Sequence, residues 1–326
     1  MNVRDKIAWC TVILLLCALV GQRLMRVDSS GTFPNRSVLL ICPYSAGGGS
    51  DMLARGLARA AEPDLGQTIT VNNVTGGGGA VGFVAGLLAP PDGHTVTMIT
   101  IELVSLPLQG LVPFQPDEFA PILRLNMDPA ALAVRADCPA NTFEEFMEWS
   151  KRDSKLSVGN SGPGTVWHMA AARLAEAASL EFNHVPFGGA SHAVTALVGG
   201  HIDAVTVSPG ELRSQILAGQ VKILGVMSED RVSYSPDSPT FTELGYPLIF
   251  GTWRGLAVPR ETPAEVRAKL AEVFSKAAYS TELAEFADAA GLNMALASGS
   301  DFALQIKNEK AQIASIMKKL GLIYEK

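Results

Sequence analysis

Residues 38–51 have the sequence VLLICPYSAGGGSD, and this stretch decides the fold. The apolar, β-branched run Val38–Cys42 predicts a buried strand. The glycine-rich turn after it leads into a helix expected over Met52–Ala61, where Leu53 and Leu57 lie four residues apart on one face. A strand, a glycine turn and a helix in succession are typical of a parallel sheet covered by helices.

The same alternation continues along the chain. Further strands are expected at Thr68–Val71, Thr95–Ile101, Leu156–Val158, Phe182–Val185, Ala204–Val207 and Val221–Val226. Further helices are expected at Val81–Leu88, after the capping residue Thr142, and at Trp167–Ala178, Ala190–Val198, Pro263–Phe274 and Phe302–Leu320. A chain of 326 residues is long enough for two domains. We therefore expect an α/β protein with two sheets.

The first thirty residues form a separate segment. Arg4 and Lys6 precede an uncharged apolar run, Ile7–Val20, which is the pattern of a secretory signal peptide. This run is shorter than the roughly 18 to 20 residues that a membrane-spanning helix needs. No clear small-residue cleavage site follows it. Two outcomes stay open, namely export with cleavage or a retained N-terminal anchor.

The charge and the cysteines exclude several classes of function. The net charge is -6, and an acidic chain argues against nucleic acid as a partner. Outside the first thirty residues the cysteines are Cys42 and Cys138. We expect two free thiols, because Cys42 belongs to a predicted buried strand. No spacing of cysteine or histidine indicates a metal site, and no metal or cofactor is expected.

Four loops share one design, in which a strand end is followed by glycine or small polar residues and then by a helix start. They are Pro43–Asp51, Asn72–Ala80, Gly159–Thr165 and Pro186–Ser191. Each leaves unpaired backbone N–H groups at a helix N-terminus, where the helix dipole also favours negative charge. Ligands of open α/β sheets bind at the carboxyl ends of the strands. Four such loops in two sheets therefore predict one anion site between two domains.

The second loop also allows an enzyme interpretation. Gly77, Gly79 and Gly82 have the spacing of a dinucleotide-binding fingerprint, and Glu102 follows about 20 residues later, as the ribose-binding acid of that fingerprint does. A NAD-dependent oxidoreductase is therefore the alternative function. Other enzyme motifs fail, because Pro163 stands where a serine-hydrolase elbow has glycine and no P-loop is present.

With these loops in place, the sequence resembles the substrate-binding receptors of tripartite tricarboxylate transporters, the Bug family of solute-binding proteins. The resemblance runs from about Val38 to the C-terminus. Its most specific segments are Pro43 with Ala46–Asp51, Pro91–Thr95, Ser161–Thr165 with His168, His184–Ala190 and Leu197–Asp203. Tyr44–Ser45 and Asn73–Thr75 depart from the family pattern and leave the identity of the ligand open.

The resemblance implies a two-domain Venus-flytrap fold of the periplasmic-binding-protein kind, type II-like, with the ligand cleft between the domains. Domain 1 would comprise residues 33–132 and 251–326, and domain 2 residues 133–250, with a hinge near Leu132 and Gly251. The resemblance further implies that amides and hydroxyls of the first two loops hold a ligand carboxylate while domain 2 closes over it.

We predict a site made chiefly of loop donors. Its expected residues are Tyr44, Ala46, Gly48, Gly49, Ser50, Asp51, Gly78, Gly79, Ser161, Thr165, His168, Gly189, Ala190, Asp203 and Arg254. Within this set, His168 lies one turn into a helix, on a face that points back toward the third loop. Asp203 is expected to orient donors of domain 2 or to meet a hydroxyl or amine of the ligand.

Arg254 stands in a short apolar stretch between Gly251 and Gly255, which is a poor place for a solvated charge. Two roles are open. It would pair with a carboxylate such as Asp51 or Asp203, or it would fork onto a second carboxylate of the ligand. The second role favours a di- or tricarboxylate.

The sequence thus predicts a periplasmic, monomeric solute-binding protein without catalysis. It would capture a small organic acid and deliver it to the integral membrane subunits of a tripartite transporter. Besides the oxidoreductase, a membrane-anchored ligand sensor is the other alternative, should the N-terminal segment stay on the mature protein.

Overall fold

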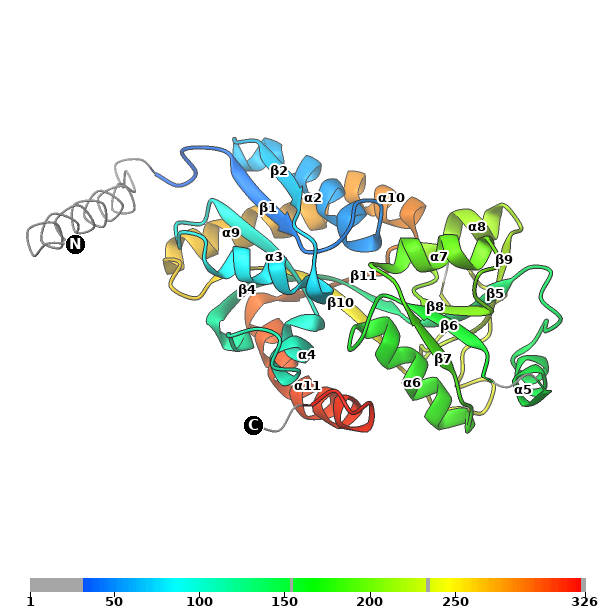
Figure 1. Ribbon diagram of the computed structural model, residues 1–326. Coiled ribbons are helices and arrows are strands. Elements are labelled where there is room, and N and C mark those ends of the chain that lie inside the picture. The colour runs from blue at the N-terminus through cyan, green and yellow to red at the C-terminus, as the bar shows by residue number, and fades with distance from the viewer. Residues whose placement is uncertain (1–31, 153–154, 233–234, 324–326) are drawn as a thin grey trace, which may run out of the picture. The chain divides into compact units, whose positions relative to one another are not determined.

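The computed structural model describes residues 32–152, 155–232 and 235–323 (Figure 1). Residues 1–30, which carry the expected export segment, lie outside the described residues. Met1–Asn35 and Arg36–Lys326 form separate units. The second unit contains both sheets and the candidate site.

The first sheet has six strands in the order β11-β4-β10-β3-β1-β2. They are β1 (Val38–Cys42), β2 (Ile69–Asn73), β3 (Thr95–Thr100), β4 (Phe119–Pro129), β10 (Gly251–Pro259) and β11 (Met294–Ser298). β1 runs parallel to β2 and β3, as expected, whereas β10 runs antiparallel to β3 and β4. The expectation of a parallel sheet is therefore wrong for half of it, because β4, β10 and β11 do not belong to strand-helix-strand repeats.

Helices cover this sheet, which with them forms lobe 1. They are α2 (Gly49–Leu65), η1 (Gly77–Gly79), α3 (Ala80–Leu87), α4 (Glu102–Leu108), η2 (Pro116–Glu118), α9 (Ala264–Ala278), α10 (Thr281–Ala290) and α11 (Gly299–Lys319). α2 packs against α9 and β2. It begins at Gly49, three residues earlier than expected, so the end of the first glycine loop is already the first helical turn.

The second sheet has five strands in the order β7-β6-β8-β5-β9 and forms lobe 2 with its helices. The strands are β5 (Ala131–Arg135), β6 (Ser157–Asn160), β7 (Asn183–Pro186), β8 (Ala204–Val207) and β9 (Val221–Val226). The helices are α5 (Phe143–Arg152), α6 (Val166–Ala178), α7 (Ala190–Val198), η3 (Gly210–Leu212) and α8 (Arg213–Leu217). The predicted cap of α5 is confirmed, since the Thr142 hydroxyl accepts from the Glu145 N–H at 3.2 Å.

The chain passes between the two sheets at two adjacent points. Ala130 separates β4 from β5, and Phe250 precedes β10. The Ala130 N–H donates to the Phe250 carbonyl at 2.9 Å, and the Phe250 N–H donates to the Met227 carbonyl at 3.0 Å. Leu132 already lies in β5 of the second sheet, so the first crossing precedes the expected boundary by two residues.

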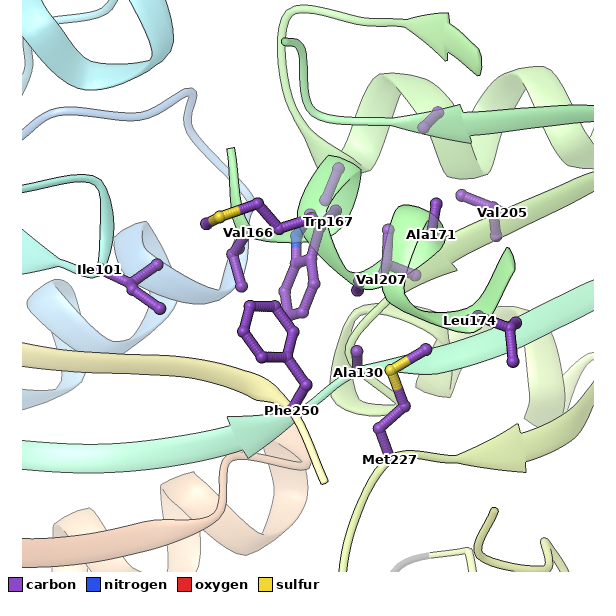
Figure 2. Packing of buried hydrophobic residues seen from close by; sticks show 14 of the residues in the cluster. Ile101, Ala130, Val166, Trp167, Ala171, Leu174, Val205, Val207, Met227 and Phe250 are labelled. Atoms are coloured by element: carbon purple, nitrogen blue, oxygen red, sulfur yellow. The ribbon is translucent and has the colours of Figure 1, made fainter. Parts of the chain in front are cut away.

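A hydrophobic cluster surrounds these crossings. Trp167 of lobe 2, Phe250 at the second crossing and Ile101 of lobe 1 are all buried there (Figure 2). Cys42 is buried and Cys138 half-buried, and both are free thiols. Burial raises the pKa of the Cys42 thiol to about 11. In the part of the chain that the structure describes, no helix has the length and apolar character needed to cross a membrane.

Candidate functional site

A pocket, called the cleft below, is lined by residues of both lobes. Lobe 1 contributes Tyr44, Ser45, Gly48, Gly49, Ser50, Thr100, Glu102, Thr252 and Arg254. Lobe 2 contributes Ser161, Val166, Trp167, Gly189, Ala190, Ser191 and Glu211. The volume of the cleft is about 50 Å³. In this arrangement of the lobes, therefore, only a small molecule fits.

Two helices, one from each lobe, begin at the cleft. α2 begins at Gly49 and α7 at Ala190. The first N–H groups of a helix have no acceptor in their own helix, so those of Ser50 and Ser191 are available to a ligand. The positive ends of the two helix dipoles add to this preference for an anion. The two N-termini together place N–H groups without acceptors at one pocket, an arrangement that suits a small anion.

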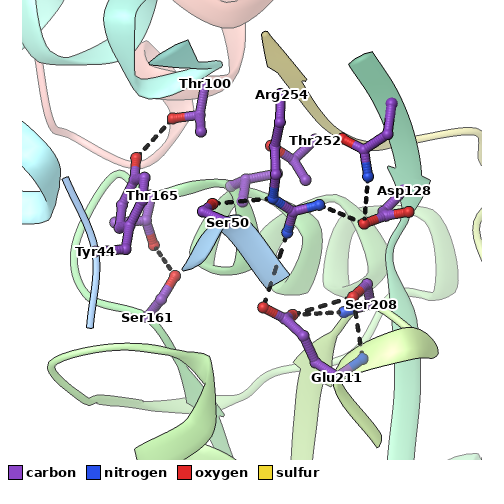
Figure 3. A network of polar contacts seen from close by, with 12 residues as sticks. Tyr44, Ser50, Thr100, Asp128, Ser161, Thr165, Ser208, Glu211, Thr252 and Arg254 are labelled. Carbon is purple, nitrogen blue, oxygen red and sulfur yellow. Dashed lines mark hydrogen bonds and ion pairs between the residues drawn. The ribbon is translucent and has the colours of Figure 1, made fainter. Parts of the chain in front are cut away.

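Arg254 of β10 lines the cleft, is 3% exposed and lies at the centre of a network of polar contacts (Figure 3). Its Nη1 pairs with the buried Asp128 on the neighbouring strand β4. Its Nε donates to the Ser50 hydroxyl at 2.9 Å. Burial lowers the pKa of Arg254, but the nearby Asp128 and Glu211 carboxylates outweigh burial and raise it, so the guanidinium stays charged.

The expected partners of Arg254 are therefore corrected. The carboxylate that pairs with it is Asp128, and neither Asp51 nor Asp203 contacts it through a hydrogen bond or ion pair in the described part of the chain. Two of the three guanidinium nitrogens belong to the scaffold, so Arg254 has only Nη2 for the cleft. This arrangement does not support the expected fork onto a ligand carboxylate, so Arg254 gives no argument here for a di- or tricarboxylate.

Glu211 of η3 faces Arg254 from lobe 2, and its side chain is 9% exposed. Its Oε2 accepts from the backbone N–H and from the hydroxyl of Ser208, both at 3.1 Å. Its Oε1 lies 3.9 Å from Arg254 Nη2, which is too long for a hydrogen bond. Burial raises the pKa of Glu211, although Arg254 opposes that rise.

A second carboxylate, Glu102, joins the lobes at another edge of the cleft. Its Oε2 accepts from the Tyr44 hydroxyl at 2.9 Å and from the Thr100 hydroxyl. Its Oε1 accepts from the Val166 N–H at 2.8 Å, which is the first amide of α6. Burial raises the pKa of Tyr44 well above its usual value, so its hydroxyl stays protonated. Glu102 thus occupies the first amide of α6, and the third loop adds Ser161 to the lining of the cleft.

Eight of the fifteen predicted residues line the cleft, namely Tyr44, Gly48, Gly49, Ser50, Ser161, Gly189, Ala190 and Arg254. The other seven lie outside its lining, namely Ala46, Asp51, Gly78, Gly79, Thr165, His168 and Asp203. Most of the seven support the loops that bear the lining residues.

Asp51 holds the first loop from behind. Its Oδ2 accepts from the Gly47 N–H at 2.9 Å, and its Oδ1 accepts from Arg55 at 3.0 Å and Asn73 at 2.8 Å. These bonds leave the carboxylate turned away from the cleft. They explain the conformation of the loop rather than contact with a ligand.

The second glycine loop is filled by protein side chains. A Cβ at Gly79 would lie 3.1 Å from the Tyr44 hydroxyl, and one at Gly78 would lie 3.4 Å from Thr165 Cγ2. The Thr165 hydroxyl in turn donates to the Gly162 carbonyl at 2.7 Å. Glu102, the supposed ribose-binding acid, has its oxygens committed to Tyr44, Thr100 and Val166. The geometry therefore gives the dinucleotide interpretation no support.

Asp203 lies at the amino ends of β6 and β8, the edge of the sheet opposite to the cleft. Its Oδ2 accepts from the Ser157 N–H at 2.7 Å and from the Ser157 hydroxyl. Asp203 lies outside the lining of this cleft, since it precedes β8 rather than following it, so the geometry does not support its expected contact with a ligand. His168 does point back to the third loop, where its Nδ1 accepts from the Gly164 N–H at 3.0 Å.

Sequence reasoning missed eight residues of the lining as ligand neighbours: Ser45, Thr100, Glu102, Val166, Trp167, Ser191, Glu211 and Thr252. The sequence around Glu211 does contain a pattern that could have indicated its place at the cleft. Ser208–Glu211 directly follows the strand β8 and repeats the design of a strand end followed by a small polar loop. Thr252 and Arg254 lie on β10, the strand that follows the second crossing, and only its placement beside β4 shows which residues face the cleft.

Comparison with known proteins agrees with this geometry. Residues 53–322 match the family described as the tripartite tricarboxylate transporter family receptor. The chain belongs to this family. A relative from Pseudomonas sp. strain P51, a UPF0065 protein of the tcbD-tcbE intergenic region, is 33% identical over 290 residues, which are 87% of this chain and 85% of the relative.

Solved structures of relatives show the same fold. A TctC solute-binding protein from Polaromonas, solved with no ligand, is 39% identical, with a TM-score of 0.69 over 88% of this chain and 100% of its own. MatC from Rhodopseudomonas palustris, solved with bound malate, is 27% identical, with a TM-score of 0.80 over 87% of this chain and 99% of its own. The family consists of substrate-binding receptors rather than enzymes. The fold is thus the mixed α/β fold of periplasmic binding proteins with two sheets.

Gly49 should tolerate no side chain, because a Cβ there would lie 2.7 Å from Arg254 Nη2 and the guanidinium is held on both other sides. We expect Gly49→Ala to lower the free energy of unfolding by about 1 to 3 kcal/mol, the usual cost of overpacking. Gly188→Ala is the matched control, since no atom lies within 4 Å of a Cβ at that position. Urea titration of both variants checks this; equal midpoints would contradict it.

His168 should make stability depend on pH. Burial and the neighbouring His184 lower the pKa of His168 to about 4 from its usual 6.5. Its stabilising contribution is therefore complete above about pH 6.5 and is lost as the pH falls toward 4. His168→Asn keeps an acceptor for the Gly164 N–H without titrating. Denaturant titrations between pH 7 and 4 should show a smaller loss of unfolding free energy for the variant, and identical losses would refute this role.

Proposed function

We propose that this protein is an extracytoplasmic solute-binding protein that captures a small organic carboxylate in the cleft and delivers it to a tripartite membrane transporter. The observation that carries the proposal is the meeting of the α2 and α7 N-termini, which come from different lobes, in one small pocket. Family membership supports it. MatC, a relative 27% identical, holds malate, which is a carboxylate.

In the proposed complex, the carboxylate lies between the two helix N-termini. The amides of Ser50 and Ser191 donate to its oxygens, and the Ser45 hydroxyl adds a further donor from the first loop. These donors are neutral amides and a hydroxyl. They would hold the negatively charged carboxylate without a further cation in the cleft. Arg254 supports this site indirectly by holding the side chain of Ser50.

We further propose that the lobes close on the ligand about the crossings at Ala130 and Phe250. Each lobe has its own sheet, and the cleft needs residues of both. The Polaromonas protein, solved without ligand, is 39% identical to this chain and has a TM-score of 0.69. MatC, solved with malate, is only 27% identical but has a higher TM-score of 0.80. A rotation of one lobe relative to the other would explain why the more identical protein has the lower TM-score. Such a rotation lowers a TM-score computed over the whole chain and leaves the sequence identity unchanged.

The proposal places the protein in the periplasm as a monomer, exported by its N-terminal segment. BugD, a relative with 29% identity and a TM-score of 0.84, is described as a periplasmic binding protein. Transport rather than sensing is preferred because the matched family is named for transporter receptors. A dicarboxylate stays within the proposed ligand class because of malate in MatC, not because of Arg254.

Carboxylic acids should raise the melting temperature, and the corresponding amides should not. A ligand that binds only the folded state adds about 2.7 kcal/mol when present at 100 times its dissociation constant. Differential scanning fluorimetry with a panel of mono-, di- and tricarboxylates and their amides measures this. Stabilisation by neutral sugars with no response to any acid would end the proposal.

A further inference from the structure

One donor and one acceptor of the cleft residues face each other as an ion pair, at a distance too long for a hydrogen bond. Arg254 Nη2 and Glu211 Oε1 lie 3.9 Å apart, and both residues line the cleft. Among the described residues, neither atom has a hydrogen bond, although the other polar atoms of both side chains do. The pair also spans the lobes, with Arg254 in β10 and Glu211 in η3. A group of the ligand placed between them would contact both lobes at once.

The structural role of Glu211 accounts for only one of its oxygens. Oε2 accepts from Ser208, and the Glu211 N–H approaches the Ser208 hydroxyl at 3.4 Å, which is the reciprocal arrangement of a capping box. The same arrangement occurs in lobe 2 at Thr240 and Glu243, where the Thr240 N–H donates to the glutamate at 2.8 Å. Glu243 lies outside the cleft lining. Capping therefore does not explain why the second oxygen of Glu211 points to Arg254.

We propose that Glu211 determines the specificity of the cleft for hydroxycarboxylates: its Oε1 accepts a hydrogen bond from a hydroxyl of the ligand while Arg254 Nη2 donates to the same hydroxyl oxygen. This inference rests on the proposed carboxylate-binding function. An oxygen can lie about 2.8 Å from both atoms, an ordinary hydrogen-bond length, across their 3.9 Å separation.

Among hydroxyl, carboxylate and ammonium groups of a ligand, only a hydroxyl satisfies both atoms. It accepts from the guanidinium and donates to the carboxylate. A second ligand carboxylate would place its acceptors against Glu211. An ammonium would donate to Glu211 but would bring its positive charge against Arg254, which has Asp128 as its own counter-ion. An acid without the hydroxyl would leave the Glu211 carboxylate, whose side chain is 9% exposed, further desolvated and its Oε1 still without a hydrogen bond.

Calorimetric titration of three matched pairs tests this: lactate and propionate, 3-hydroxybutyrate and butyrate, malate and succinate. In the native protein, at least one hydroxy acid should bind about 10- to 150-fold more tightly than its partner, as expected for a hydrogen bond to a charged group. In Glu211→Gln the ratio should fall below about threefold by that scale, chiefly through weaker binding of the hydroxy acid. The amide keeps its oxygen toward Ser208 and presents a donor to the cleft.

Glu243→Gln is the control, because it alters the same kind of capping contact outside the cleft and should leave every ratio unchanged. Equal binding within all pairs, tighter binding of the unhydroxylated acids, no binding of any hydroxy acid, or an unchanged ratio in Glu211→Gln would each overturn the inference. Tighter binding of aspartate than of malate, if this preference is lost in Glu211→Gln, would also overturn the inference. That result would assign the place between Glu211 and Arg254 to an ammonium group of the ligand.

These failures differ from failure of the proposed function. If propionate, butyrate or succinate binds without discrimination, the carboxylate site stands and only the role of Glu211 falls. If no acid in a wide panel binds or raises the melting temperature, the carboxylate site itself falls. Melting of Glu211→Gln without ligand shows whether the variant is folded. Should it be unfolded, Glu211→Asp, which keeps the charge but withdraws the oxygen from the cleft, should lower the same ratio.

Discussion

The cleft depends on the buried ion pair between Arg254 and Asp128. A guanidinium that is 3% exposed needs a charged partner, because an unpaired buried charge is strongly destabilising. Asp128 is supported in turn by the Asn126 amide and by the Asn293 N–H, both at 2.9 Å. Arg254 pairs with Asn126 in the register of β10 and β4, and Asn126 and Asp128 point to the same face because side chains alternate along a strand.

The Arg254–Asp128 pair also positions the other parts of the cleft, because the remaining guanidinium nitrogens of Arg254 face Ser50 and Glu211. Nε of Arg254 holds the hydroxyl of Ser50 and with it the first turn of α2, whose amides face the cleft. Nη2 faces Glu211 of lobe 2. Gly49 is required because a Cβ there would collide with the guanidinium. One side of the cleft therefore presents helix N-termini to an anion, and the other presents a buried donor beside an acceptor. This division favours a ligand with two different polar groups.

Much of the fold could be predicted from sequence because its signals are local. β1, α7, β8 and β9 lie at the predicted residues, since short apolar runs and helix starts depend on neighbours in the chain. β4, β10 and β11 could not be placed, because their pairing joins segments more than a hundred residues apart. The residues of the site divide in the same way, into those with a local sequence signal and those that depend on tertiary contacts. Gly48, Gly49, Gly189 and Ala190 were found from their loops, whereas the partner of Arg254 and the contact of Glu102 with α6 depend on tertiary structure. Asp203 lies outside the lining because it directly precedes a strand whose other end faces the cleft.

The most direct test of this account is a crystal structure of the protein with a bound carboxylate, with malate as the first choice. We expect a carboxylate oxygen of the ligand within about 3.2 Å of the backbone nitrogens of both Ser50 and Ser191, with the Arg254–Asp128 pair intact beneath it. A ligand whose carboxylate instead pairs with Arg254 after displacing Asp128, or which binds outside the cleft, would contradict the account.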